Sequence, residues 1–282
     1  MAGKFARSWN LMKASAAVLR SDKSLMMFPL LSGFCCLLVA ASFLIPIAIV
    51  AVGAEHEGRQ GLPLAGYIGL FAFYLVQYFV IIFFNTALAG AALQRLRGET
   101  TSFAGGLAVA RSRIGAIFGY ALIAATVGLF LRALQERLGF VGRLVAGLLG
   151  LAWTVATFLV VPVLASEDIG PTDAVKRSVE LLKRTWGENL IGNAGLGVVF
   201  GLLTFVAALI AVALVVGAAS TESTALIVAA VAVVVVVLSL LGLVQASLQG
   251  IYAAALYQYA EEGKVGAGFD QAMLEQAFRP KS

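Results

Sequence analysis

Amide side chains within long apolar segments are the residues whose type and spacing could bind a ligand. The pairs are Gln77 with Asn85, Asn189 with Asn193, and Gln245 with Gln249. Residues one or two helical turns apart lie near one face of a helix, so each pair could line a polar cavity or bind a lipid headgroup. Amides in apolar helices also bond to neighbouring helices, at about 0.6 kcal/mol on average. Both interpretations are kept.

The chain shows no pattern typical of catalysis or metal binding. Glu55, His56 and Glu57 are adjacent, but His56 is the single histidine and three residues of one polar turn supply too few ligands. The serines and threonines of apolar segments lack a nearby base to activate them. Cys35 and Cys36 have no spacing that suggests metal ligation or a disulfide. We therefore predict no catalytic residue, no metal site and no cofactor, and we expect that the protein is not an enzyme.

Charged residues are missing from the middle of every apolar segment. Burying a charge in lipid costs several kcal/mol, and such residues mark ion and proton pathways where they occur. Their absence disfavours a transporter that couples to protons or sodium ions through membrane carboxylates.

The elements that position these residues follow from composition. Of the 282 residues, 61% are hydrophobic and 12% are charged, and the mean hydropathy is +0.95. A soluble domain carries about 25% charged residues and could not bury so much apolar surface. Six segments are long enough to cross about 30 Å of hydrocarbon. They are residues 28–52, 64–93, 115–131, 144–164, 190–217 and 224–258.

These segments predict one all-α membrane domain over residues 1–282, a bundle of six transmembrane helices with short amphipathic helices. Lipid offers no partner for backbone N–H and C=O groups, so each span must be helical. This holds even for the valine-rich run 231–238, despite its β-propensity. The second and last segments exceed what one crossing needs, so we expect them to tilt or to protrude from the membrane.

The distribution of Lys and Arg predicts the orientation. The termini and the even-numbered connections carry 16 of these residues, and the odd-numbered connections carry four. Because basic residues stay in the cytoplasm, both termini are expected there, in a multi-pass protein of a bacterial inner membrane. The net charge of +5 then indicates contact with anionic lipid headgroups rather than with nucleic acid.

Three basic segments on the expected cytoplasmic side have the apolar spacing of amphipathic helices. They cover residues 4–20, 103–114 and 171–186, and each precedes a pair of spans. The pattern suggests a unit of short helix, span, outer turn and span that occurs three times. These helices could form a docking surface, or they could lie as anchors in the membrane interface. The candidate docking residues are Trp9, Arg111, Arg113, Lys176, Arg177, Lys183, Arg184 and Trp186.

Several stretches give the chain a resemblance to a known family. They are Phe5-Ala6-Arg7-Ser8-Trp9, Phe28-Pro29-Leu30-Leu31-Ser32-Gly33, Asp173-Ala174-Val175-Lys176-Arg177-Ser178, and Ala254-Ala255-Leu256-Tyr257-Gln258-Tyr259-Ala260. Together they resemble an uncharacterised bacterial family of six-span integral membrane proteins, a domain of unknown function. The third stretch is also similar to the membrane domain attached to some glycerophosphodiester phosphodiesterases. The resemblance implies a fold and a bacterial cytoplasmic membrane, but no activity and no catalytic residues.

Two functions remain open on this basis. The first is a non-enzymatic scaffold, assembly partner or regulator that acts through its cytoplasmic helices. The alternative is a passive carrier or conduit for a lipid or a small neutral solute, which the amides would line. Closely spaced glycines, such as Gly115 with Gly119 and Gly197 with Gly201, predict tight helix packing within the chain or in a homo-oligomer.

Overall fold

A computed structural model describes residues 4–56, 63–137, 139–186, 195–221 and 223–263. This part of the chain is almost entirely α-helical and contains no strand. The helices are α1 (Lys4–Ser21), α2 (Met27–His56), α3 (Leu64–Leu96), α4 (Phe103–Ser112), α5 (Ile114–Arg137), α6 (Gly139–Ala156), α7 (Val160–Ser166), α8 (Pro171–Trp186), α9 (Gly195–Ala219) and α10 (Thr224–Glu262). A single 3-10 turn, η1 (Lys23–Met26), joins α1 to α2. The all-α prediction is confirmed.

Six helical stretches are long and apolar enough to cross a membrane, as the sequence predicts. Five of them contain α2, α3, α5, α9 and α10, and the remaining stretch contains α6 followed by α7. The third span was predicted to end at residue 131, but its helix α5 continues to Arg137. On the surface of this extension, Arg132 pairs with Glu136 at 2.9 Å. The predicted start of the fifth span, residues 190–194, lies outside the described residues.

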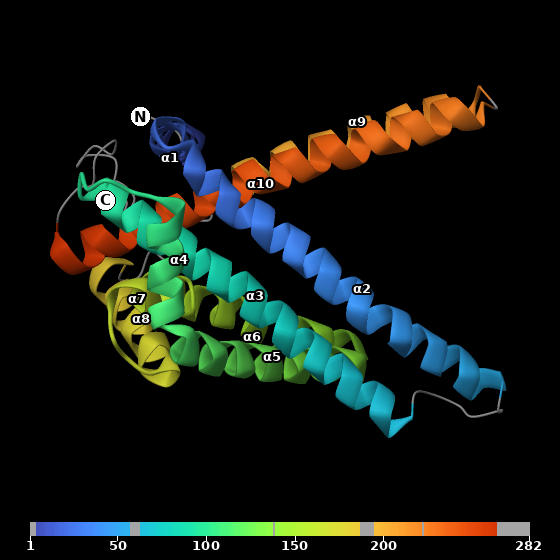
Figure 1. The fold of residues 1–282 in the computed structure, drawn as a ribbon, viewed down its shortest axis with the longest axis horizontal. Helices are drawn as coiled ribbons and strands as arrows, with labels where there is room; N and C mark the ends of the chain where they lie inside the picture. Colours follow the sequence, from blue (N-terminus) through green and yellow to red (C-terminus); the bar gives the residue numbers. More distant parts are fainter. Residues whose placement is uncertain (1–3, 57–62, 138, 187–194, 222, 264–282) are drawn as a thin grey trace.

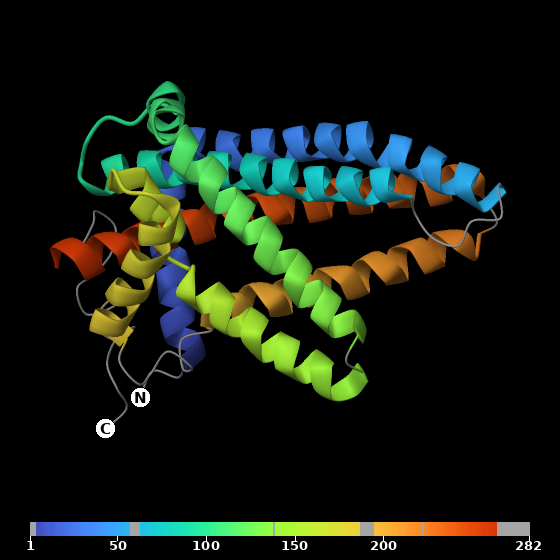
Figure 2. The same ribbon diagram turned by 90° about the horizontal axis from the view of Figure 1, so that it is seen from below.

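The spans form three antiparallel hairpins, α2–α3, α5–α6 and α9–α10. The C-terminal ends of α2, α5 and α9, where each hairpin reverses, lie at the same end of the molecule, which we call the distal end (Figure 1, Figure 2). The opposite end carries α1, α4, α7 and α8, and we call it the base. Each hairpin is preceded along the chain by one short basal helix, so the predicted order of short helix, span, turn and span occurs three times.

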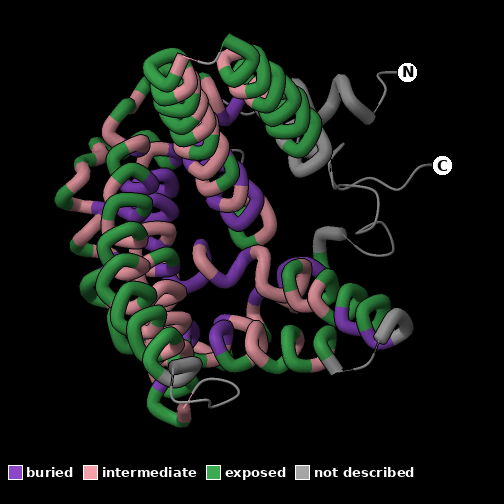
Figure 3. The backbone as a smooth tube through the Cα atoms, turned by 90° about the vertical axis from the view of Figure 1, so that its right-hand side faces the viewer, coloured by how far each residue is buried: buried purple, intermediate pink, exposed green. Residues whose placement is uncertain are grey.

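The hydrophobic core lies in the base. The buried run of α3 starts at Ile82 and that of α10 starts at Ser247, and both runs continue toward the basal ends of these helices. In the first, fifth and sixth spans, by contrast, no residue of the most apolar stretch is buried (Figure 3). Lipid is as apolar as these side chains, so the distal halves gain little by packing against one another.

The basal helices connect the three hairpins in a cyclic order. The helix α4 packs mainly on α3 of the preceding hairpin, and α8 packs on α7, α5 and α6 of the preceding hairpin. The helix α1, which has no preceding hairpin, packs on α9 and α10 and so closes the cycle. Each short helix therefore joins two units, and α8 also contacts α10 of its own unit.

A break in the fourth span gives α8 its docking position. Pro162 has no N–H to bond the carbonyl of Phe158, so the helix stops at Ala156 and resumes at Val160. The hydroxyl of Ser178, on α8, donates to the carbonyl oxygen of Ala156 at 2.7 Å and accepts from the N–H of Leu159 at 3.1 Å. One buried serine therefore supplies a partner to two of the backbone groups at the break.

Glycines allow the closest approaches between basal elements. A Cβ on Gly106 of α4 would lie 2.5 Å from the ring of Phe28 and 2.7 Å from the carbonyl oxygen of Ala87. Gly119 is similarly close to Pro171, so it serves packing within the chain, whereas Gly115 and Gly201 face open space. The described structure thus uses one glycine of the predicted Gly115–Gly119 pair.

Candidate functional site

The exposed face of α8 is the strongest candidate for an interaction surface. Its apolar stripe is buried in the base, including Ala174 and Leu181, so it does not face lipid. Lys183 and Arg184 are exposed on the polar side. Lys176 is exposed as well and pairs with Asp173 at 3.0 Å, one helical turn away. This helix is amphipathic, as predicted, and its basic face points away from the bundle.

The other short helices repeat this arrangement. In α4, Gly106 and Ala110 are buried while Arg111 is exposed. In α1, Val18 is buried while Arg20 is exposed. The side chains of Trp9 and Trp186, two predicted docking residues, lie outside the described residues. We define the basic basal surface as the exposed residues Arg20, Lys23, Arg111, Lys176, Lys183 and Arg184.

Arg177, predicted as a docking residue, holds the base together. Its guanidinium pairs with Glu167 at 3.3 Å, with Glu261 at 2.5 Å and with Glu180 at 3.5 Å, and its side chain is only 23% exposed. Burial lowers the pKa of Arg177, but the hydrogen bonds and charges of Glu167 and Glu261 raise it above its ordinary value. These ion pairs join the end of α7, α8 and the end of α10.

Tyr257 of α10 completes this cluster by donating from its hydroxyl to Glu167 at 3.0 Å. We call Glu167, Arg177, Tyr257 and Glu261 the basal polar cluster. Sequence reasoning missed the two carboxylates and the tyrosine because they lie 10 to 84 positions from Arg177 along the chain. A signal was present in the acidic residues that end α10, since these are the natural partners of the basic helix α8.

Two further ion pairs connect basal elements. Arg113, another predicted docking residue, pairs with Asp168 in the loop between α7 and α8. Arg97, after the end of α3, pairs with Glu262 at the end of α10 at 2.6 Å. Arg113 and Arg177 therefore form ion pairs within the chain, and they are not part of the basic basal surface.

Asp22 caps the 3-10 turn at the junction of α1 and α2. Its carboxylate accepts from the N–H of Ser24 at 2.9 Å and from the hydroxyl of Thr101, which precedes α4. Burial raises the pKa of Asp22, but these hydrogen bonds and the charge of Arg95 hold it below its ordinary value. The carboxylate therefore ties the first unit to the second in its charged form.

The predicted amide pairs are only partly brought together. On α3, Gln77 lies one turn from Phe73, whose ring packs on Phe43 of α2 at 6.2 Å between centroids. Asn85 lies two turns from Tyr78, whose hydroxyl lies close to Gly128 of α5. Gln77 and Asn85 are separated by about 80° around the helix axis. The side-chain oxygen of Gln77 is buried and has no hydrogen-bond partner among the described residues.

The helices α3 and α10 meet at the level of these amides. Leu88, three residues after Asn85 on α3, packs against Gly250 of α10. Gln245 and Gln249 share a face with Tyr252, whose ring contacts Phe158 of the fourth span at 6.4 Å between centroids. Asn189 and Asn193 lie outside the described residues.

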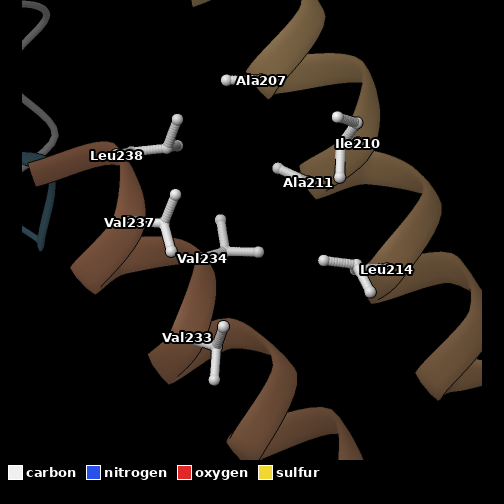
Figure 4. Close-up of a pocket in the computed structure, with 8 residues that line it drawn as sticks. All are labelled: Ala207, Ile210, Ala211, Leu214, Val233, Val234, Val237 and Leu238. Carbon is white, nitrogen blue, oxygen red and sulfur yellow. The ribbon is translucent and has the colours of Figure 1, made fainter. Parts of the chain in front are cut away.

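An apolar cavity of about 50 Å³ lies between α9 and α10 (Figure 4). Its lining residues are Ala207, Ile210, Ala211, Leu214, Val233, Val234, Val237 and Leu238. None of the predicted amides lines it, and it contains no group that could bind a polar solute. It reflects loose contact between two helices that face lipid.

The described residues contain no group of three or more His, Cys, Asp or Glu side chains that could hold a metal ion. Cys35 and Cys36 are free and half-buried. The side chain of His56 and all of Glu57 lie outside the described residues, so the Glu55–His56–Glu57 segment has no defined geometry.

Comparison with known proteins identifies one match. The model of a family of unknown function (DUF6159) matches residues 64–269, from the start of α3 to a point beyond α10. Neither the curated proteins nor the solved structures contain a match to the chain.

Proposed function

The chain belongs to the family of unknown function DUF6159, and we propose that this member is a non-enzymatic scaffold or assembly protein of a bacterial cytoplasmic membrane. In this proposal it binds an acidic protein partner through its base. The basic basal surface supports this role, because exposed cations lie on helices whose apolar faces are fixed in the core. A rigid array of charges provides specificity and fast association with an oppositely charged partner.

The orientation follows from the positive-inside rule. The termini and the even-numbered connections of the sequence carry 16 Lys and Arg residues, and the odd-numbered connections carry four. The proposal therefore places the base and both termini in the cytoplasm. Basal cations beside the membrane would also attract anionic headgroups, at about 1 kcal/mol each.

Affinity isolation from solubilised bacterial membranes tests this function. The test variant Arg111→Gln/Lys183→Gln/Arg184→Gln removes three charges without touching the basal ion pairs. The matched control Arg111→Lys/Lys183→Arg/Arg184→Lys keeps the charge. We expect a defined partner with the wild type and the control, and at least a tenfold lower yield with the neutral variant. An equal yield from all three chains would contradict the proposal.

Passive carriage of a lipid or neutral solute is the second candidate, and the amides of Gln77, Asn85, Gln245 and Gln249 within the apolar helices α3 and α10 favour it. A conduit would need a path through the base, where Leu248, Leu256 and Tyr257 are buried. Liposomes that contain the purified protein and a fluorescent phospholipid test this role. A rate of lipid exchange between leaflets that exceeds that of empty liposomes would support carriage, and equal rates would exclude it for that lipid.

A further inference from the structure

The three hairpins reach different heights at the distal end. The distal ends of α5 and α6 stop well short of those of the α2–α3 and α9–α10 hairpins (Figure 1, Figure 2). One contact fixes this difference, because Arg132, near the end of α5, donates from its guanidinium to the hydroxyl of Tyr74 on α3 at 2.7 Å. Tyr74 lies ten residues after Leu64, the first residue of α3, so α3 continues for about 15 Å beyond this contact.

The parts of α2 and α3 beyond this contact are apolar. On α3 they comprise residues 64–73, and on α2 they comprise residues 44–54, which follow Phe43 and its contact with the ring of Phe73 at 6.2 Å. Neither segment contains a charged or an amide side chain. Their exposed side chains include Ile45, Ile49, Leu64 and Ile68. Exposure of this surface to water would be strongly unfavourable, so we expect lipid chains to cover it.

The lengths of α3 and α10 indicate how far the hydrocarbon extends. The buried run of α3 begins at Ile82, 18 residues after the helix starts, and that of α10 begins at Ser247, 23 residues after its start. About 20 helical residues cross the hydrocarbon, which therefore extends from the distal ends of these helices to the base. In α5, by contrast, the last residue of the core is Ala124, and the helix ends only 13 residues later at Arg137. The difference of about seven residues leaves the end of α5 about 10 Å below the distal border of the hydrocarbon.

The segment that connects α5 to α6 at this depth is basic. Residues 132–143 contain three arginines and one glutamate, which gives a net charge of +2. These arginines are three of the four basic residues in the odd-numbered connections, so the exception to the positive-inside rule is concentrated in this segment. Charged side chains at this depth need a charged or hydrated partner. An anionic group that reaches the segment from the distal side would supply one.

Arg132 is held in place and can still bind such a group. Its Nε donates to Glu136 at 2.9 Å and its Nη1 donates to Tyr74 at 2.7 Å. These bonds use two of the five N–H donors of the guanidinium, whose side chain is 61% exposed. A guanidinium binds two oxygens of one phosphate group well, because its donors lie in one plane. Toward the base, exposed apolar side chains such as Phe130 on α5 and Leu148 on α6 suit acyl chains.

We propose that the distal end of the α5–α6 hairpin binds the phosphate group of one phospholipid of the distal leaflet, and that Arg132 is its main donor. The headgroup of this lipid lies deeper than those of its neighbours, because the hairpin ends below the ordinary border. Tyr74 and Glu136 are positioning residues that hold the guanidinium. A lipid is favoured over free phosphate because its acyl chains cover the apolar surface of α5 and α6. The site lies at the end opposite to the basic basal surface and does not depend on the proposed scaffold function.

Fluorescence quenching in phosphatidylglycerol vesicles tests the depth of the hairpin. A chain with Cys35 and Cys36 changed to Ala carries a bimane probe at Ala133→Cys, beside Arg132, or at Leu64→Cys, at the distal end of α3. The vesicles contain a phospholipid with a nitroxide on its headgroup. We expect this headgroup to quench both probes, although the two positions lie at different depths. If iodide in the water quenched the probe at position 64 and the lipid did not, the tip of α3 would lie outside the membrane and the proposal would be overturned.

The variant Arg132→Gln tests the phosphate contact. We expect headgroup quenching of the probe at Ala133→Cys to fall at least twofold, while quenching of the probe at Leu64→Cys stays the same. The matched control Arg132→Lys keeps the charge and should retain most of the quenching. Unchanged quenching at position 133 in Arg132→Gln would overturn the proposal. The depth comparison keeps Arg132 unaltered, so it does not depend on the folding of this variant.

Inorganic phosphate separates the two sources of the phosphate group. It is added outside the vesicles that carry the probe at Ala133→Cys, and sodium chloride of equal ionic strength is the control. We expect both salts to leave headgroup quenching unchanged, because the lipid is also bound through its acyl chains. A loss of quenching with phosphate alone would show that the site takes the free ion, and it would overturn the assignment to a lipid.

Discussion

Arg177 shows how one residue can decide between a surface role and a structural role. Its guanidinium forms ion pairs with three carboxylates from different parts of the base, at distances of 2.5–3.5 Å. Lys176, the preceding residue, is 73% exposed and makes one local pair. Since exposed ion pairs contribute about 0–1 kcal/mol and charged hydrogen bonds in half-buried sites contribute about 1.5–3 kcal/mol, neighbouring basic residues differ in importance.

We therefore predict that Arg177→Gln lowers the free energy of unfolding by about 2 kcal/mol, because Glu167 and Glu261 lose their common cation. The control Lys176→Gln changes it by less than about 0.5 kcal/mol. Thermal unfolding in detergent, followed by circular dichroism, measures both. Equal shifts for the two variants would show that the basal polar cluster contributes nothing specific.

The lowered pKa of Asp22 predicts that the stability of the folded chain depends on pH. Its pKa is held below the ordinary value in the folded chain, so its contribution to stability is fully present above about pH 5 and is lost as the pH falls through the lowered pKa. The wild type should then be more stable than Asp22→Asn at pH 7, and the difference between their unfolding midpoints should shrink below about pH 4. A difference that stays constant down to pH 3 would contradict this account.

At the scale of elements, the contact between α8 and the broken fourth span is stabilised by one hydroxyl. Ser178→Ala leaves the N–H of Leu159 and the carbonyl of Ala156 without this partner. We expect a loss of about 1–3 kcal/mol, the cost of unsatisfied buried backbone groups. Ser112→Ala is the control, because Ser112 is exposed and bonds only to its own helix. Chemical denaturation in mixed micelles compares them, and a similar small effect of both changes would contradict the role of Ser178.

The helix α4 depends on a glycine for its approach to α3. Gly106→Ala forces a methyl group against Phe28 and a backbone carbonyl, and such overpacking costs about 1–3 kcal/mol. The same change at Gly115, which faces open space, should be neutral or stabilise the helix by up to about 1 kcal/mol. Unfolding midpoints of the two variants should therefore move in opposite directions or differ clearly. If both variants were as stable as the wild type, the close packing of α4 would be wrong.

At the scale of the whole molecule, hydropathy predicts the spans because lipid imposes length and helicity on each of them. The apolar spacing in 103–114 and 171–186 similarly predicts α4 and α8. The packing partners of these helices could not be predicted, since Arg177 and Arg113 look like any exposed cation until Glu261 and Asp168 are placed beside them. Ser178 has no sequence signal at all, because its role depends on a break 19 residues away.

The division into a packed base and separated distal hairpins also depends on the whole molecule. The most apolar stretches of α2, α9 and α10 contain no buried residue, so their composition predicts a span but not the helices that lie beside it. Of the predicted cavity residues, Gln245 and Gln249 lie one turn apart on α10, as their spacing in the sequence requires. How the amides of α3 lie relative to those of α10 depends on the packing of the two helices, which local sequence patterns do not predict.

The central claim is that the base is a cytoplasmic docking surface, and site-specific photo-crosslinking in living bacteria tests it most directly. A photoreactive amino acid replaces Glu180, on the exposed side of α8, or Thr221, in the distal turn between α9 and α10. The account predicts that Glu180→photoprobe forms a discrete adduct with an acidic cytoplasmic protein, and that neutralising Arg111, Lys183 and Arg184 abolishes it. The absence of an adduct at position 180, or the same adduct at position 221, would contradict it.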